Sequence, residues 1–301
     1  MTEAAPAPRL ALCLVIGVAA GWAAWIIGAS SHVTMDFEYY WRGARAYFAG
    51  ADPYRVQPDT PAWPLSDRLF YPLPALLLLW PVHALSERAA AALFVGVPAG
   101  LLAWRLSRDA LWPLLLFASP AFLMTVLLGQ WSPWIVLGMV APWAGGVFLA
   151  KPSLGLAALV ARPSRGAVVG CLLLGLASLV AGLGWVAEWR ANLATLVAHP
   201  APLFTLAGCW IALVVVRWRS RDARLVLAFA AVPQLLFFAD QLPLLLVARD
   251  RRELAFLVLA GWAVAVPWLE AATPGLHVRL AAPYVLLGVY GPAVYLTLRR
   301  A

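Results

Sequence analysis

The chain has 301 residues, of which 63% are hydrophobic and only 12% are charged. Soluble domains average about 25% charged residues, so this composition excludes an ordinary soluble protein and leaves no room for a separate soluble domain. The net charge is +8, but the arginines lie in short loops between apolar runs, which is the pattern that orients membrane proteins. We therefore predict one integral membrane domain over residues 1–301 and no nucleic-acid binding.

The first apolar run, Leu10–Ala29, follows Arg9 and is long enough to be an uncleaved first span that starts in the cytoplasm. The longest polar stretch, Ser30–Leu69, comes next, and we predict that it forms the first outer loop. Within it, Asp36–Ala49 has helical spacing. One face of that helix carries Phe37, Tyr40, Trp41, Ala44 and Phe48. An amphipathic helix of this kind is expected to lie along the membrane interface.

The rest of the chain is a series of apolar segments separated by short loops. These segments are Phe70–Leu85, Ala89–Leu106, Leu111–Leu128, Trp134–Val160, Ala167–Ala187, Ala201–Val216, Arg224–Phe238, Leu242–Ala248, Leu254–Leu269 and Leu280–Leu298. The fourth is too long for one span, and Pro142 and Pro152 interrupt it, so we expect re-entrant or half-spanning pieces there. The predicted fold is an all-α polytopic membrane bundle of about ten to twelve transmembrane or re-entrant helices.

Basic residues mark the predicted cytoplasmic loops. They are Arg105, Arg108, Arg162, Arg165, Arg217 to Arg224, Arg249, Arg251, Arg252, Arg299 and Arg300. Lys151 is different, because it is the only lysine and it follows an apolar run directly before Pro152. An ionisable group inside an apolar segment predicts function, here contact with a phosphate. The alternative is a lysine that snorkels to the lipid headgroups.

Carboxylates are scarce, and two of them, Asp36 and Glu38, lie just beyond the first span. Two positions apart on a helix, they cannot share one face. Asp36 is nearer the span and is the better candidate for a general base that deprotonates a sugar hydroxyl. For both, the alternative is a solvated loop acid.

Two further polar residues interrupt apolar runs. Gln130 either binds a substrate or ends a helix, and Asp240 either faces the same site as Asp36 or marks a surface turn. The four histidines, at positions 32, 83, 199 and 277, have no ligand spacing, so no protein-built zinc site is expected. A divalent cation that assists Asp36 and Glu38 at a phosphate is left open.

Four short motifs occur in order along the first half of the chain. They are Asp36-Phe37-x-x-Tyr40 with Asp52-Pro53-Tyr54, then Phe70-Tyr71-Pro72, Gly129-Gln130 and Lys151-Pro152. Together they resemble motifs of glycosyltransferase family 87, which are bacterial membrane glycosyltransferases of the GT-C fold. The chain departs from the family by its short length, by Leu73 where a second proline is usual, and by a compressed stretch between Gln130 and Lys151.

The resemblance implies an inverting glycosyltransferase, multi-pass in the bacterial cytoplasmic membrane, with its active site on the extracytoplasmic face. The donor would be a polyprenyl-phosphate-linked sugar, mannose or arabinofuranose, and the acceptor a glycolipid or glycan of the cell envelope. Asp36 would be the general base and Lys151 would contact the donor phosphate. The predicted substrate-binding residues are Glu38, Tyr40, Arg42, Asp52, Tyr54, Tyr71, Gln130, Lys151 and Asp240.

Two other readings stay open at this stage. A polytopic lipid transporter or flippase predicts paired broken helices in two matching halves, and the sequence shows no matching second half. A catalytically inactive lipid-binding relative, or a membrane scaffold, would make Asp36 and Lys151 dispensable for transfer.

Overall fold

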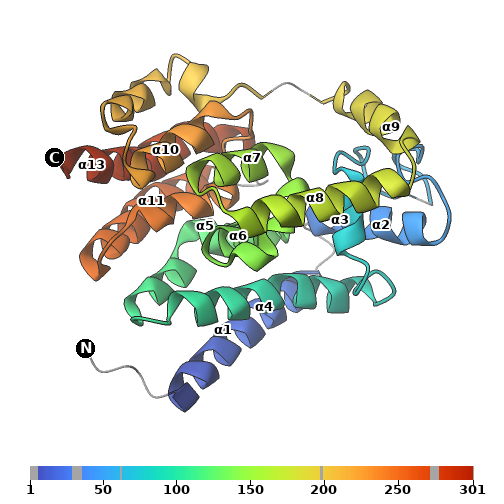
Figure 1. The fold of residues 1–301 in the computed structure, drawn as a ribbon, viewed down its shortest axis with the longest axis horizontal. Coiled ribbons are helices and arrows are strands. Elements are labelled where there is room, and N and C mark those ends of the chain that lie inside the picture. The colour runs from blue at the N-terminus through green and yellow to red at the C-terminus, as the bar shows by residue number, and fades with distance from the viewer. Residues whose placement is uncertain (1–5, 29–35, 62, 197–198, 272–277, 301) are drawn as a thin grey trace.

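The computed structural model describes residues 6–28, 36–61, 63–196, 199–271 and 278–300. These residues form helices and connecting loops with no β-strand among them (Figure 1). The all-helical prediction is therefore confirmed for this part of the chain. Ala29, which was to end the first span, and Ser30–Met35 at the start of the outer loop lie outside the described residues, as do His32 and His277.

The α-helices vary widely in length. They are α1 (Pro6–Ile27), α2 (Asp36–Phe48), α3 (Leu73–Leu78), α4 (Glu87–Leu106), α5 (Pro120–Leu128), α6 (Ser132–Val140), α7 (Pro152–Ala161), α8 (Arg165–Val180), α9 (Gly184–Leu193), α10 (Arg221–Ala231), α11 (Arg251–Ala271), α12 (Ala282–Val285) and α13 (Gly291–Arg299). Tighter or wider helical pieces join them. These are η1 (Trp112–Ala118), η2 (Pro142–Leu149), η3 (Pro202–Phe204), η4 (Cys209–Arg217), η5 (Phe238–Val247), η6 (Val278–Ala281) and the π-helix η7 (Leu286–Tyr290).

Three of these helices, α1, α4 and α11, are long and apolar enough to cross a membrane. The pair α8 and α9 would add a fourth span if it counts as one, although the two helices are bent by 104° at the break between them. The other apolar segments are built from shorter helical pieces. The predicted total of about ten to twelve transmembrane or re-entrant helices stays a prediction.

The helices α1 and α4 pack side by side through four glycines (Figure 1). Gly17 and Gly21 on α1 face Gly96 and Gly100 on α4, each pair spaced four residues apart. A Cβ atom added at Gly96 would lie 2.7 Å from the carbonyl oxygen of Gly17. Small residues at this spacing let the backbones approach closely, which is how helices associate where lipid supplies no hydrophobic driving force.

The helix α2 matches the predicted amphipathic helix almost to the residue. Phe37, Tyr40, Trp41 and Ala44 are buried on one face, as the spacing predicts. That face packs on the protein itself, since a Cβ added at Gly43 would meet the side chains of Leu69 and Leu76. The apolar face of α2 therefore packs on other parts of the protein, and the position of this helix at the membrane interface stays a prediction.

The segment from residue 132 to residue 161 is broken where the prolines predict. The helix α6 ends at Val140 before Pro142, and η2 ends at Leu149 before Pro152 starts α7. Proline lacks the amide hydrogen that would continue the helix, and it disfavours helical backbone in the residue before it. The predicted breaks in this segment are confirmed, and the re-entrant or half-spanning placement of its pieces stays a prediction.

The polar loop that leads to Tyr71 is held by α9. Trp189 donates its ring N–H to the carbonyl of Phe70 at 2.8 Å, and Asn192 donates to the carbonyls of Tyr54 at 3.0 Å and Leu69 at 3.2 Å. The turn between α8 and α9 includes Gly182, whose φ of +111° suits glycine. The sequence did not predict this bend, because it reads as one apolar segment, Ala167–Ala187.

We expect Gly96→Ala to destabilise the protein by about 1–3 kcal/mol, because the new methyl group overlaps the backbone of α1. Gly100→Ala is the matched control, because its Cβ would lie 3.5 Å from the nearest atom, an ordinary contact. Alanine is also the better helix former, so this control should be neutral or stabilising. Thermal unfolding in detergent tests the pair, and equal midpoints for the two variants would contradict the close approach.

Candidate functional site

Four polar side chains from distant parts of the sequence meet in a chain of hydrogen bonds. Gln130 donates its amide to Oδ2 of Asp36, and its Oε1 accepts from Nζ of Lys151 at 3.2 Å. Lys151 also donates to Oδ1 of Asp240 at 2.5 Å. We call these four residues the lysine cluster. All four were candidates from the sequence, and the structure brings them together.

Gln130 reaches the cluster because α5 ends at Gly129. Gly129 takes the left-handed conformation with a φ of 63°, which glycine adopts without steric cost. The backbone N–H of Gln130 then donates to the carbonyl of Thr125 at 3.1 Å, which completes the end of the helix. Gln130 therefore ends the helix, as one of its two predicted roles requires, and its side chain also belongs to the lysine cluster; substrate binding by Gln130 stays a prediction.

Lys151 stands directly before α7, at the break between η2 and α7. Pro152 at the first helical position holds Lys151 out of the helix, with φ −133° and ψ 80°. Its side chain is 21% exposed, and it contacts an acid and an amide. The ammonium of Lys151 thus has hydrogen-bond partners inside the protein. The alternative prediction was a lysine that extends to the lipid headgroups.

Asp240 lies near the start of η5, beside the end of α5. The hydroxyl of Thr125 donates to the carbonyl of Ala239 at 3.5 Å, which links the two segments next to the cluster. The side chain of Asp240 is only 8% exposed. Asp240 therefore faces the lysine cluster, as Asp36 does, which was one of its two predicted positions. The other, a turn at the surface, is wrong.

Asp36 is the first residue of α2, where a carboxylate is favoured by the positive end of the helix dipole. Burial raises the pKa of Asp36 to about 6, and Lys151 and Gln130 oppose part of that rise. The nearby charge of Asp240 acts in the same direction as burial. A carboxylate with a pKa near neutrality is a stronger base than a solvated one, and it is still ionised at pH 7.

Two tyrosines pack beside the cluster. The ring of Tyr71 lies 4.6 Å from the ring of Tyr40, and the hydroxyl of Tyr40 donates to the carbonyl of Gly129. Burial, with the charges of Asp36 and Asp240, raises the pKa of Tyr71, so its hydroxyl stays protonated and can donate a hydrogen bond. Tyr40 is fully buried, and its ring also lies 5.4 Å from the ring of Trp131, which follows Gln130 in the chain.

The other predicted binding residues lie elsewhere in the structure. Glu38 and Arg42 form an ion pair of 2.7 Å on the surface of α2. Asp52 accepts from the amide of Tyr54 at 2.9 Å, and Tyr54 is buried with its hydroxyl donating to the carbonyl of Tyr71 at 3.1 Å. Within the described residues, none of these four forms a hydrogen bond or ion pair with the lysine cluster. Asp52 and Tyr54 shape the loop that carries Tyr71.

A second polar group lies directly behind Asp240 and was not predicted from the sequence. Gln241 donates to Oε1 of Gln234 at 2.8 Å, and the amide of Gln234 lies 3.4 Å from the hydroxyl of Tyr290 on the π-helix η7. All three side chains are buried. The signal that could have found them was two glutamines in an apolar stretch, which is costly to bury without partners.

The charges of the lysine cluster do not cancel when both acids are ionised. Two carboxylates accompany one ammonium, so the group then carries one net negative charge. An ammonium has three N–H donors. Gln130 and Asp240 accept two of them, which leaves one for an oxygen of a bound molecule. Within the described residues no group of three or more histidine, cysteine, aspartate or glutamate side chains could hold a metal ion.

Comparisons of the chain with known proteins found no relative. No protein-family model matches the chain, and searches of curated proteins and of solved structures found no match.

We expect Lys151→Met to cost about 3–5 kcal/mol of stability at pH 7, because it leaves Asp240 as an unpaired buried charge. The double variant Lys151→Met/Asp240→Asn should recover much of that loss, since neither member of the ion pair then remains charged. Unfolding midpoints of the two variants and of Asp240→Asn alone form a double-mutant cycle. A double variant as unstable as Lys151→Met would show that the ion pair is not what Lys151 contributes.

Proposed function

We propose that the protein is a membrane glycosyltransferase that uses a polyprenyl-phosphate-linked sugar as donor, as the resemblance to glycosyltransferase family 87 implies. The observation that carries the proposal is the lysine cluster. It places a candidate base, Asp36, and the only lysine, Lys151, on the two sides of one glutamine. A transfer from a lipid phosphate needs both groups within the reach of one sugar.

Lys151 is suited to the phosphate of the donor. Its third N–H is available to a phosphate oxygen while Asp240 and Gln130 hold the other two. Negative charge builds up on that oxygen as the bond to the sugar breaks, and a fixed cation stabilises it most at that moment. Asp240 holds the lysine ammonium in place before the donor binds.

Asp36 is suited to the acceptor. In the proposed step, its carboxylate takes the proton of an acceptor hydroxyl while the hydroxyl oxygen bonds to the anomeric carbon of the donor. The bond between that carbon and the phosphate oxygen breaks, and its electron pair stays on the phosphate. The configuration at the sugar is inverted, and the products are the glycosylated acceptor and polyprenyl phosphate.

Asp36→Asn tests the general base. It keeps the carbonyl oxygen that accepts from Gln130 but cannot accept the proton, so we expect transfer to fall by about 10²–10⁴-fold while the protein still folds. The measurement is release of free polyprenyl phosphate from polyprenyl-phosphate-mannose or -arabinose, with a membrane extract as the source of acceptor.

Asp59→Asn is the matched control, since Asp59 is an exposed acid of the same loop with a φ of 54°, a conformation that asparagine tolerates. It should leave transfer unchanged. Near wild-type transfer by Asp36→Asn would rule out the assignment of Asp36. If the wild-type protein transfers neither sugar and binds neither donor, the proposed function itself is wrong.

The pH dependence of transfer gives a separate prediction. A protonated Asp36 cannot accept a proton, and its pKa is raised to about 6. We therefore expect kcat/KM to rise about tenfold per pH unit below pH 6 and to level off above it. A profile that is flat through this range in the wild-type protein, measured with saturating acceptor, would contradict Asp36 as the base.

A further inference from the structure

We infer that the surface formed by residues 217–224, 249–253 and 299–300 binds the headgroups of anionic phospholipids, and we call it the arginine surface. These three short segments hold nine arginines against three acids, a surplus of six positive charges out of the net +8 of the whole chain. Residues 36–71 of the outer loop carry five acids and four arginines. The positive charge is thus concentrated in one place.

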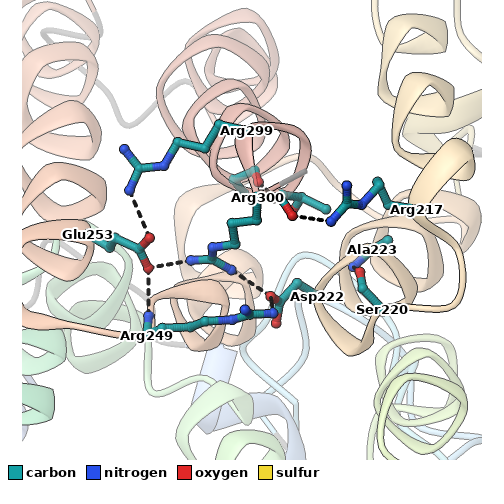
Figure 2. A network of polar contacts seen from close by, with 10 residues as sticks. Arg217, Ser220, Asp222, Ala223, Arg249, Glu253, Arg299 and Arg300 are labelled. Atoms are coloured by element: carbon teal, nitrogen blue, oxygen red, sulfur yellow. Dashed lines mark hydrogen bonds and ion pairs between the residues drawn. The ribbon is translucent and has the colours of Figure 1, made fainter.

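The three segments are far apart in the sequence, and two buried acids bring them together. Asp222 accepts from Arg249 at 2.7 Å and from Arg300 at 2.5 Å (Figure 2). Glu253 accepts from Arg299 at 2.8 Å, from Arg300 and from the backbone amide of Arg249. The network ties the start of α10, the start of α11 and the end of α13 into one rigid unit.

The two acids inside this network are already paired with arginines, and other arginines lie outside it. Arg221, Arg251 and Arg252 are exposed, and no ion pair is recorded for them within the described part of the chain. Fixed cations that have no partner in the protein are attracted to an anionic surface. These three charges are therefore available to a ligand outside the protein.

The position of the arginine surface relative to the membrane indicates which ligand it binds. Arg251 and Arg252 begin α11, which is long and apolar enough to span a membrane, so they lie where the hydrocarbon meets the headgroups. Two exposed aromatic rings belong to the same region. Trp218 lies in the segment 217–224 and Tyr295 lies four residues before Arg299, and the two are 57% and 54% exposed. Arg219 lies 5.7 Å from the ring of Trp218, and Arg299 lies 5.6 Å from the ring of Tyr295.

Exposed aromatic rings beside arginines are typical of the headgroup layer, where the ring packs on lipid and the cation meets phosphate. A soluble polyanion such as nucleic acid would use the charges but would gain little from rings at this level. The observations therefore favour a lipid carrying a net negative charge. This inference is independent of the lysine cluster and of the proposed function.

The test compares how much anionic lipid the purified protein retains. The protein is exchanged into nanodiscs of phosphatidylcholine mixed with phosphatidylglycerol, extracted in mild detergent, and weighed by native mass spectrometry to count bound lipids of each kind. We expect wild-type protein to retain phosphatidylglycerol in preference. Each arginine near an anionic surface is worth about a fivefold gain in affinity, so Arg251→Gln/Arg252→Gln should reduce the preference about tenfold after screening by salt.

The matched control is Arg45→Gln/Arg88→Gln, which removes two exposed arginines from the other end of the bundle. It should keep the wild-type preference, and both double variants should unfold at the wild-type temperature because none of the four arginines belongs to the buried network. Three results would overturn the inference: no preference in wild-type protein, an unchanged preference in Arg251→Gln/Arg252→Gln, or an equal loss in the control.

Discussion

A single ammonium group in an apolar bundle imposes the constraint on which the candidate site depends. A charge that is buried without a partner costs several kcal/mol, so Lys151 has to meet an acid wherever the chain places it. Asp240 meets it at 2.5 Å and Gln130 takes a second hydrogen bond. Satisfying this one side chain fixes the end of α5, the start of α7 and the start of η5 at one point, and Asp36 joins them through Gln130.

The breaks in the helices allow these chain segments to bring their polar side chains together. A continuous helix through Pro142 and Pro152 would use every backbone group internally and would point its side chains to all sides in turn. The breaks end η2 at Leu149 and start α7 at Pro152, so Lys151 leaves the helical path. The left-handed turn at Gly129 does the same for Gln130. Irregular backbone of this kind is tolerated inside a membrane bundle only where protein surrounds it or where it lines a cavity.

Local sequence patterns predicted the features that have local causes. The acids at the start of α2, its apolar face, and the proline breaks around Lys151 can all be read from neighbouring residues. The convergence of Asp36 with Gln130, 94 positions away, has no local signal, and neither has the ion pair of Lys151 with Asp240. The sequence also could not say that α2 turns its apolar face to the protein, because an amphipathic pattern is the same whether lipid or side chains cover it.

The two polar groups of the molecule handle charge in opposite ways. The lysine cluster holds few charges, mostly buried, and burial raises the pKa of Asp36 within it. The arginine surface holds many charges, uses two acids to assemble them, and leaves a large positive excess exposed. Low dielectric makes each charge in the first group strong at short range, whereas water and salt weaken each charge in the second. The first arrangement therefore suits chemistry at one atom, and the second suits adhesion that depends on many weak contacts.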